Sequence, residues 1–201
     1  ASGRWRRERE VVGTDAGYKE FTTWNTAYKS VGRARFAHHV FAARMSALWR
    51  DGDSAALARI GGPPGQLYNF GFGVVGDAAG LLPVRGYDDE RRGTKAWTAS
   101  VEYRLPLAMI GRGYKLWPIF IDRVYVSGFN DAGKASCPGD LASRLSLCMD
   151  DSDDPLFSIG GEVAFHFALF SFANSRARIG YGQPLTQGES GKLYVSFGSA
   201  F

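Results

Sequence analysis

The sequence predicts an all-β fold, and within that class an antiparallel transmembrane β-barrel. Apolar and polar residues alternate with a period of two in one segment after another, whereas the spacing of an amphipathic helix is almost absent. Most of the alternating segments are roughly 9 to 15 residues long, whereas strands of soluble sandwiches have about five or six residues and membrane-crossing strands about 9 to 11. Short and long connections also alternate along the chain, as they do in outer-membrane barrels.

About eight segments are predicted to be strands from this alternation. In chain order they are residues 5–12, 21–29, 36–49, 97–107, 114–129, 159–169, 176–182 and 193–201. The segment 97–107 is the clearest, because Trp97 and Val101 fall on one face and Glu102 and Arg104 on the other. The face opposite the apolar residues therefore carries charges, as expected of the water-filled interior of a membrane barrel.

The connections predict how the barrel is oriented. Residues 31–33 and 173–174 are expected to be short turns, and residues 50–95 and 131–155 long connections. The whole chain, 1–201, is then one part of a barrel domain, in which 51–95 is a long extracellular loop that folds inward and 131–155 is a second extracellular loop.

Composition limits the alternatives. No apolar run is long enough for a spanning helix. The net charge of +4 is mild, so we expect no nucleic-acid partner. Cys137 and Cys148 lie in one Pro/Gly/Asp-rich stretch, where a loop disulfide and two free thiols are both open readings.

Several familiar patterns lack the residues that their chemistry needs. Residues 71–76 fit G-x-G-x-x-G, but no helix follows to support a dinucleotide site. Ser54 has no candidate general base, and the acidic run 150–154 lacks the glycine and distal Glu of a calcium loop. The three histidines, His38, His39 and His166, show no metal-ligand spacing. We therefore expect no catalytic residues, no enzyme activity, no cofactor and no metal.

Four motifs, in order, resemble the BamA/TamA superfamily of outer-membrane barrels, also called bacterial surface antigens. The sequence PVRGY at 83–87 is similar to the family's motif at the tip of the sixth extracellular loop, and SVEYRLPL at 100–107 to the strand that follows it. FNDAG at 129–133 fits F-x-D-x-G, and SFGSAF at 196–201 looks like the closing strand, although Ser199 stands where an aromatic or apolar residue is usual. GYGQPL at 180–185 also suits the penultimate strand, so the resemblance covers roughly residues 36–201.

The resemblance implies roles for these residues. Val84, Arg85, Gly86 and Tyr87 would be the loop-lock motif, which holds the loop inside the barrel. The C-terminal strand signal, which the assembly machinery reads, would consist of Leu193, Val195, Phe197 and Phe201. The family's barrel has about sixteen strands, of which these would be the last eight; the interior of an eight-stranded barrel is filled by its own side chains and has no room for a loop tip.

The partner of Arg85 can be predicted on physical grounds. A cation on an inward-folded loop is desolvated unless it is paired, and a bidentate contact with Asp131 is the expected solution. Strand parity favours Asp131 over Asp122, because an inward Asp131 keeps Arg123 out of the lipid. The expected lumenal partners are Asp131 with Phe129 and Gly133, and secondarily Glu102 and Glu162. The alternative is a solvated turn on which Arg85 pairs with Asp88 or Asp89.

Two functional hypotheses follow from the resemblance. The first is an assembly, insertion or translocation factor in the bacterial outer membrane, acting on client barrel proteins or an exported substrate. The second is a transport or anchor barrel that carries its own periplasmic domain, such as a propeller or a patatin-like lipase. In either case the partners include outer-membrane lipid and lipopolysaccharide, and accessory lipoproteins for the first. A plain porin, a third possibility, would need no Arg85–Asp131 pair.

Overall fold

The computed structural model describes residues 3–6, 19–34, 36–51, 57–61, 81–87, 91–113, 119–137, 154–169, 173–186 and 190–199. Within these ranges the chain forms strands, and no helix there is long and apolar enough to cross a membrane.

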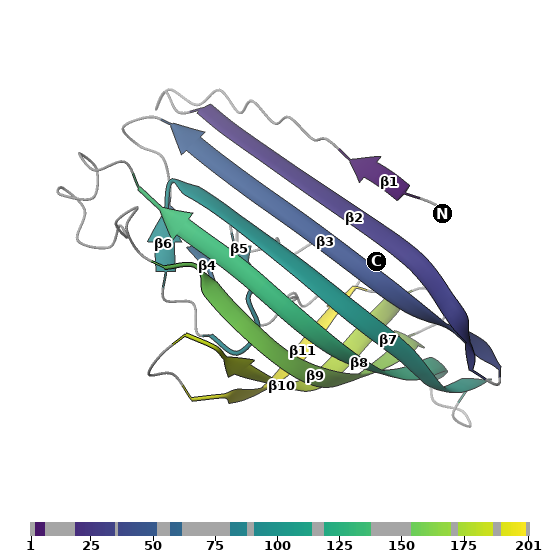
Figure 1. Ribbon diagram of the computed structural model, residues 1–201. Coiled ribbons are helices and arrows are strands. Elements are labelled where there is room, and N and C mark those ends of the chain that lie inside the picture. Colours follow the sequence, from purple (N-terminus) through teal and green to yellow (C-terminus); the bar gives the residue numbers. More distant parts are fainter. Residues whose placement is uncertain are drawn as a thin grey trace.

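One large sheet of eight strands dominates the molecule (Figure 1). Its order is β1-β2-β3-β7-β8-β9-β10-β11, and every neighbouring pair is antiparallel. The strands are β1 (Gly3–Arg6), β2 (Lys19–Ala34), β3 (Ala37–Asp51), β7 (Lys95–Gly113), β8 (Ile119–Ser136), β9 (Leu156–Leu169), β10 (Ala173–Pro184) and β11 (Lys192–Ser199). The predicted all-β antiparallel class is confirmed.

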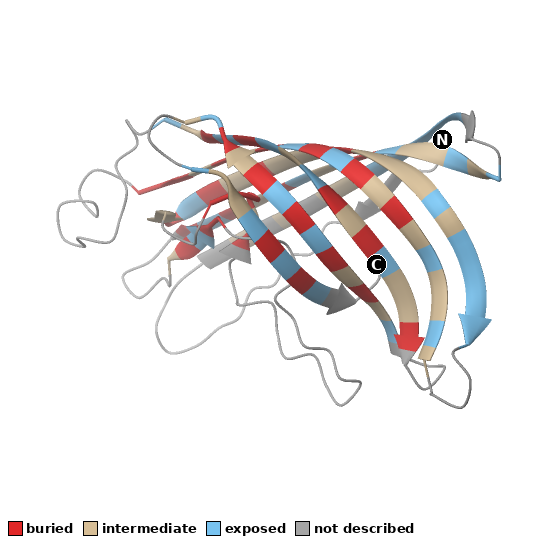
Figure 2. Cartoon of the chain, turned by 90° about the horizontal axis from the view of Figure 1, so that it is seen from below, coloured by how far each residue is buried: buried red, intermediate tan, exposed pale blue. Residues whose placement is uncertain are grey.

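The sheet curves strongly, but it is open. Within the described ranges no pairing joins β1 to β11, which lie at its two edges, so a closed barrel is not seen. Burial alternates along much of β3 and of β7 to β11, as the striped colouring of several strands in Figure 2 shows. The concave face is the buried one, and it carries the polar residues. The convex face leaves large apolar side chains exposed, among them Val101 and Ile159.

A second, smaller sheet lies in the long connection between β3 and β7. It consists of β4 (Ala58–Ile60), β5 (Leu81–Leu82) and β6 (Arg91–Gly93) in the order β5-β4-β6. Its apolar residues form the hydrophobic core together with the inner face of the large sheet. That core comprises Leu48, Ala58, Ile60, Leu82, Val84, Tyr87, Ala96, Ala135 and Leu156. The described parts of this connection, residues 57–61, 81–87 and 91–94, therefore lie against the inner face of the large sheet.

Each of the eight predicted segments overlaps one strand of the large sheet. Residues 7–12, 114–118 and 200–201 of those segments lie outside the described residues. The observed strands are mostly longer than predicted, because pairing continues past the last clearly alternating residue. The strand β8, for example, runs to Ser136, so the connection expected at 131–155 begins later.

Both predicted short turns are wrong in position. The strand β2 continues through residues 31–33 with a bulge after Ser30, and Gly32 accommodates it with a φ of 76°. The chain reverses after Ala34, which pairs with Ala37. Ala173 likewise belongs to β10 and pairs with Leu169. Gly32 therefore marks a β-bulge and not the turn that the sequence predicts.

Short and long connections alternate as predicted. Residues 35–36, 114–118 and 170–172 join strands at one end of the sheet, and residues 52–94, 137–155 and 185–191 at the other. The small sheet and the loop tip belong to the end with the long connections.

Candidate functional site

The loop tip, defined as residues 84–87, is buried against the concave face of the large sheet. Val84, Arg85, Gly86 and Tyr87 are all buried, and the side chain of Arg85 is among the largest that are fully enclosed. The solvated-turn alternative for Arg85 is therefore wrong. A guanidinium in this position needs partners for its hydrogen-bond donors, because an unpaired buried charge is very costly.

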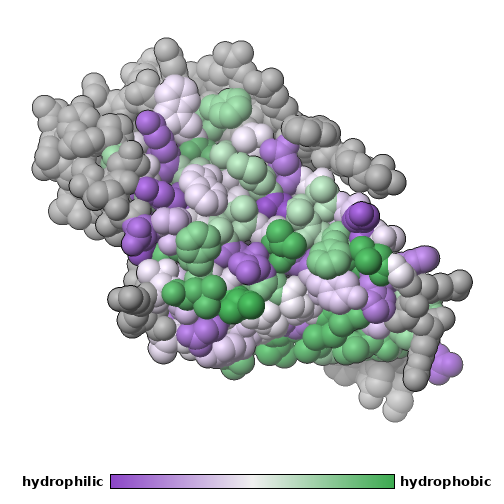
Figure 3. Space-filling view, viewed as in Figure 1, coloured by the Kyte–Doolittle hydropathy of each residue, from purple (hydrophilic) through white to green (hydrophobic). Residues whose placement is uncertain are grey.

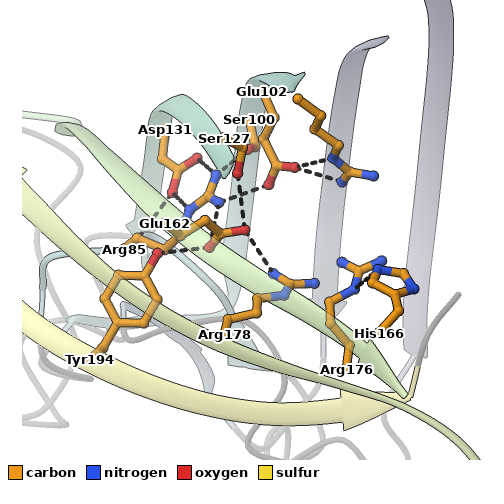
Figure 4. A network of polar contacts seen from close by, with 11 residues as sticks. Arg85, Ser100, Glu102, Ser127, Asp131, Glu162, His166, Arg176, Arg178 and Tyr194 are labelled. Atoms are coloured by element: carbon orange, nitrogen blue, oxygen red, sulfur yellow. Dashed lines mark hydrogen bonds and ion pairs between the residues drawn. The ribbon is translucent and has the colours of Figure 1, made fainter. Parts of the chain in front are cut away.

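Asp131 accepts three hydrogen bonds from Arg85, two from the guanidinium and one from the backbone N–H (Figure 4). Arg85 Nε donates to Oδ2 at 2.7 Å and Nη2 donates to Oδ1 at 2.6 Å, which makes the contact bidentate. The Arg85 backbone N–H also donates to Oδ2 at 3.1 Å. The predicted Arg85–Asp131 pair is present, and the backbone bond fixes the loop tip itself as well as the side chain.

Glu102 and Glu162 bind the same guanidinium, so the secondary candidates act in addition to Asp131. Arg85 Nη1 lies 2.7 Å from Glu102 Oε1 and 3.4 Å from Glu162 Oε2. Two neutral groups complete the environment: Ser100 Oγ accepts a bond of 2.9 Å from Nη2, and the Phe129 ring lies 3.6 Å from Arg85 Cζ. We call Arg85 and these five residues the Arg85 cluster.

Strand register explains why these residues meet. Three adjacent cross-strand rows of the inner face contribute to the cluster. Ser100 pairs with Asp131, Glu102 with Phe129, and Ser127 with Glu162. Because inward positions on one strand are two residues apart, a single arginine can reach across all three rows.

Further polar side chains hold the carboxylates. Arg104 makes two bonds to Glu102 Oε2, at 2.8 and 2.6 Å. Glu162 Oε1 accepts from Ser127 Oγ at 3.3 Å and lies 4.0 Å from Arg178 Nη1. The guanidiniums of Arg85, Arg104 and Arg178 thus balance the charges of Asp131, Glu102 and Glu162.

The electrostatics of Arg85 follow from this arrangement. Burial by itself lowers the pKa of a guanidinium, because it disfavours the charged form. Here the hydrogen bonds and charge of Asp131, together with the charges of Glu102 and Glu162, outweigh burial and raise the pKa of Arg85 above its ordinary value. A guanidinium is always protonated in proteins, so the positive charge of Arg85 is a fixed part of the cluster.

Glycines let the loop tip approach the sheet. Gly86 has a φ of 92°, and a Cβ at this position would lie 2.9 Å from the backbone carbonyl carbon of Gly182 on β10. A Cβ at Gly182 would in turn lie 2.7 Å from the Gly86 nitrogen. Val84 sits over Gly133, where a Cβ would come within 2.8 Å of its Cγ2. The inner surface of the sheet is therefore shaped to fit this loop.

Tyr87 binds the loop tip to a second set of residues. Its hydroxyl donates a hydrogen bond of 2.6 Å to the Phe157 carbonyl on β9 and lies 2.9 Å from Thr186 Oγ1. The loop tip is thus bonded to β7, to β8, to β9 and to Thr186, which follows β10.

The remaining predicted residues lie away from this cluster. Leu193, Val195 and Phe197 point outward on β11 and are 74%, 54% and 48% exposed, and Phe201 lies outside the described residues. Cys137 is buried and disulfide-bonded, and Cys148 is the other cysteine of the sequence but lies outside the described residues.

The segment around Ser54, the G-x-G-x-x-G motif and most of the acidic run lie outside the described residues, at 52–54, 71–76 and 150–153. The histidines have unrelated environments: His39 bonds Tyr103, whereas His166 accepts a bond from Arg176. Across the described ranges no group of three His, Cys, Asp or Glu residues could hold a metal ion.

Sequence reasoning missed several members of the site. Ser100 opens the segment SVEYRLPL but was given no role there. Arg178, and Tyr194, which donates a hydrogen bond of 2.9 Å to Glu162, carry no motif of their own, and only their inward parity on neighbouring strands could have indicated them. Gly182 did carry a signal, because glycines at alternate positions on one face of a strand indicate a close approach by another segment.

Comparison of the chain with protein-family models, curated proteins and solved structures finds no match.

Proposed function

We propose that this chain is the C-terminal half of a bacterial outer-membrane β-barrel of about sixteen strands, and that the barrel assists the assembly, insertion or translocation of other proteins. The observation that carries the proposal is a sheet whose outer face is apolar and whose inner face is charged, with the loop tip bound to that inner face.

The large sheet is apolar outside and charged inside. On β7 the neighbours Val101 and Glu102 are 50% and 6% exposed, and on β10 Ile179 and Arg178 are 47% and 6% exposed. Apolar residues (green) lie across the face of the sheet seen in Figure 3. Scattered exposed apolar residues are normal on soluble proteins, but regular alternation of apolar outward and charged inward positions along the strands is what a membrane barrel requires.

The height of the apolar surface fits a membrane. On β9 the outward positions from Phe157 to Phe167 are aromatic or aliphatic except for Gly161. Ten residues at about 3.3 Å each, tilted by about 40°, span roughly 25 Å along the barrel axis, the height of the apolar band in outer-membrane barrels. Trp49 and Lys95 lie at the long-connection end on neighbouring strands, where an aromatic and cationic border is expected.

The loop tip sets the size of the barrel. Closing these eight strands alone would leave an interior only wide enough for their own side chains. The concave face instead encloses the loop tip and the small sheet. A wider barrel, completed by strands outside these 201 residues, accommodates both.

The Arg85 cluster supports an assembly role over simple conduction. It fills the interior with charge-paired side chains and ties the loop to three strands, which suits a barrel whose internal loop stabilises one conformation of its wall. Such a protein acts by binding and positioning, on client barrel proteins or an exported substrate, within outer-membrane lipid and lipopolysaccharide, with accessory lipoproteins as further candidate partners.

The test is client insertion by the full-length protein in liposomes. Arg85→Ala should slow the folding of an added barrel client by about tenfold or more, because a loss of only ~1.4 kcal/mol in the active arrangement suffices for that factor. Arg91→Ala is the control, since Arg91 lies in the same loop but bonds the exposed Asp154 carbonyl. The readout is the heat-dependent gel mobility of the client.

The outcomes separate the hypotheses. If the wild-type protein does not speed the folding of any added client, the assembly role is contradicted and the transport or anchor barrel remains. If a correctly folded Arg85→Ala protein inserts clients at the wild-type rate, the part that the Arg85 cluster plays in assembly is contradicted. Recovery of the wild-type protein from the aqueous fraction, with no protein in the outer membrane, would contradict the membrane assignment itself.

A further inference from the structure

The last strand of the sheet is connected to the loop tip through one carboxylate. We propose that Tyr194 is a positioning residue, which orients Glu162 for Arg85 and thereby couples the seating of the loop tip to the stability of β11. This inference goes beyond the proposed function, because it concerns how two parts of the chain affect each other whatever client the protein serves.

The contact is direct. Tyr194 Oη donates a hydrogen bond of 2.9 Å to Glu162 Oε2, the same oxygen that lies 3.4 Å from Arg85 Nη1 (Figure 4). Both side chains are buried, Tyr194 to 8% exposure and Glu162 to 3%. A hydrogen bond to a buried carboxylate is among the stronger ones in proteins.

Gly180 on β10 leaves the space through which the Tyr194 side chain reaches Glu162. Glu162, Gly180 and Tyr194 form one cross-strand row, so the ring must cross β10 to reach β9. Gly180 leaves the space: a Cβ there would lie 2.6 Å from Tyr194 Cζ and 2.8 Å from Glu162 Cβ. A side chain of any size at residue 180 would displace the ring.

The shared oxygen makes the coupling specific. The other oxygen, Oε1, is bonded by Ser127 and lies 4.0 Å from Arg178, so Ser127 and Tyr194 hold the two oxygens in different directions. Without the Tyr194 hydroxyl, Oε2 is free to turn away from Arg85. Any such effect is reciprocal, so loss of Arg85 must weaken the hold of Glu162 on Tyr194 by the same factor.

The strand β11 depends on such a tether. Within the described residues it pairs only with β10, and it is shorter than the strands between β2 and β10 in the large sheet. In the proposed barrel a strand outside these residues would pair with the other side of β11. A short strand at such a junction opens more easily than the longer strands within the sheet. The bond through Tyr194 is a second attachment, to the next strand but one, and its strength depends on the loop tip.

Hydrogen–deuterium exchange of the reconstituted full-length protein tests the coupling. Tyr194→Phe removes only the hydroxyl, and it should raise exchange of the β11 amides about tenfold. It should also raise exchange at residues 85–87, where the Arg85 amide bonds Asp131, by about threefold, since the tip loses only part of one contact. Tyr181→Phe is the control, because its hydroxyl bonds Gln183 on the exposed face.

A second pair of variants tests the space between Tyr194 and Glu162. Gly180→Ala should reproduce both increases, whereas Gly161→Ala should not, since a Cβ at Gly161 would meet only the Ser127 carbonyl at an ordinary 3.5 Å. If β11 loosens in Tyr194→Phe while exchange at the tip stays unchanged, Tyr194 is a local brace and the coupling is wrong. No change in either segment overturns it as well. Neither readout involves a client, so a failed insertion assay leaves this test intact.

Discussion

The two faces of the large sheet are formed by the same strands, but they differ in how strictly each residue is determined by its contacts. On β9, Glu162 points inward and is 3% exposed, whereas Ile159 points outward and is 48% exposed. Every inward charge of the Arg85 cluster has named partners within 3.4 Å, so each contact depends on the identity of a particular residue. The outward residues need only be apolar and of moderate size. The inner face is therefore specific and intolerant, and the outer face is permissive as long as it stays uncharged.

The largest effect is expected on the inner face. Asp131→Asn removes the charge that binds Arg85 in bidentate fashion, and breaking a buried ion pair in this way costs about 3 to 5 kcal/mol. Unfolding of the refolded protein in denaturant measures the loss. The matched control is Asp122→Asn, whose ion pair with Arg123 is exposed, for which about 0 to 1 kcal/mol is expected. Equal effects of the two variants would remove the distinction between the faces.

A somewhat smaller effect is expected from charging the outer face. Ile179→Arg places a cation at a position that is already 47% exposed, which costs little in water but about 2 to 4 kcal/mol at the middle of a bilayer. Leu185→Arg, beyond the end of β10, should be nearly neutral. The measurement is unfolding free energy in lipid vesicles. A neutral Ile179→Arg protein would show that water covers this face.

The smallest effect compares two tyrosine hydroxyls. Tyr87→Phe loses the inner-face bond to the Phe157 carbonyl and should cost about 1 kcal/mol. Tyr181→Phe loses an exposed bond on the outer face and should change the unfolding free energy by less than about 0.5 kcal/mol. Thermal unfolding of both variants in the same detergent resolves the difference. A larger loss for Tyr181→Phe would reverse the expected ranking of the faces.

Strand parity is what made the fold predictable. Alternation in 97–107 and 159–169 assigns each side chain to a face, and the face of Asp131 followed from keeping Arg123 out of lipid. Parity cannot supply register. That Glu102, Asp131 and Glu162 occupy adjacent rows depends on how the strands pair, so the sequence indicated three candidate carboxylates but not that all three bind one arginine.

Other misses have separate causes. The strands β4, β5 and β6 are two or three residues long, too short for any alternation to be recognised. Tyr194 lies two strands away from Glu162, and its role depends on the absence of a side chain at Gly180 between them. No local sequence pattern indicates such a gap. The bulge at Gly32 looked like a turn because both use positive φ.

The order of the cluster along the chain has a consequence for folding. Arg85 precedes all its side-chain partners, which follow 15, 17, 46 and 77 residues later. A slip of one residue in β7, β8 or β9 would turn that strand's carboxylate to the opposite face. The arginine can therefore be fully neutralised only after three successive strands have arrived in the right alignment. One guanidinium thus acts as an internal check that this part of the sheet has been put together correctly.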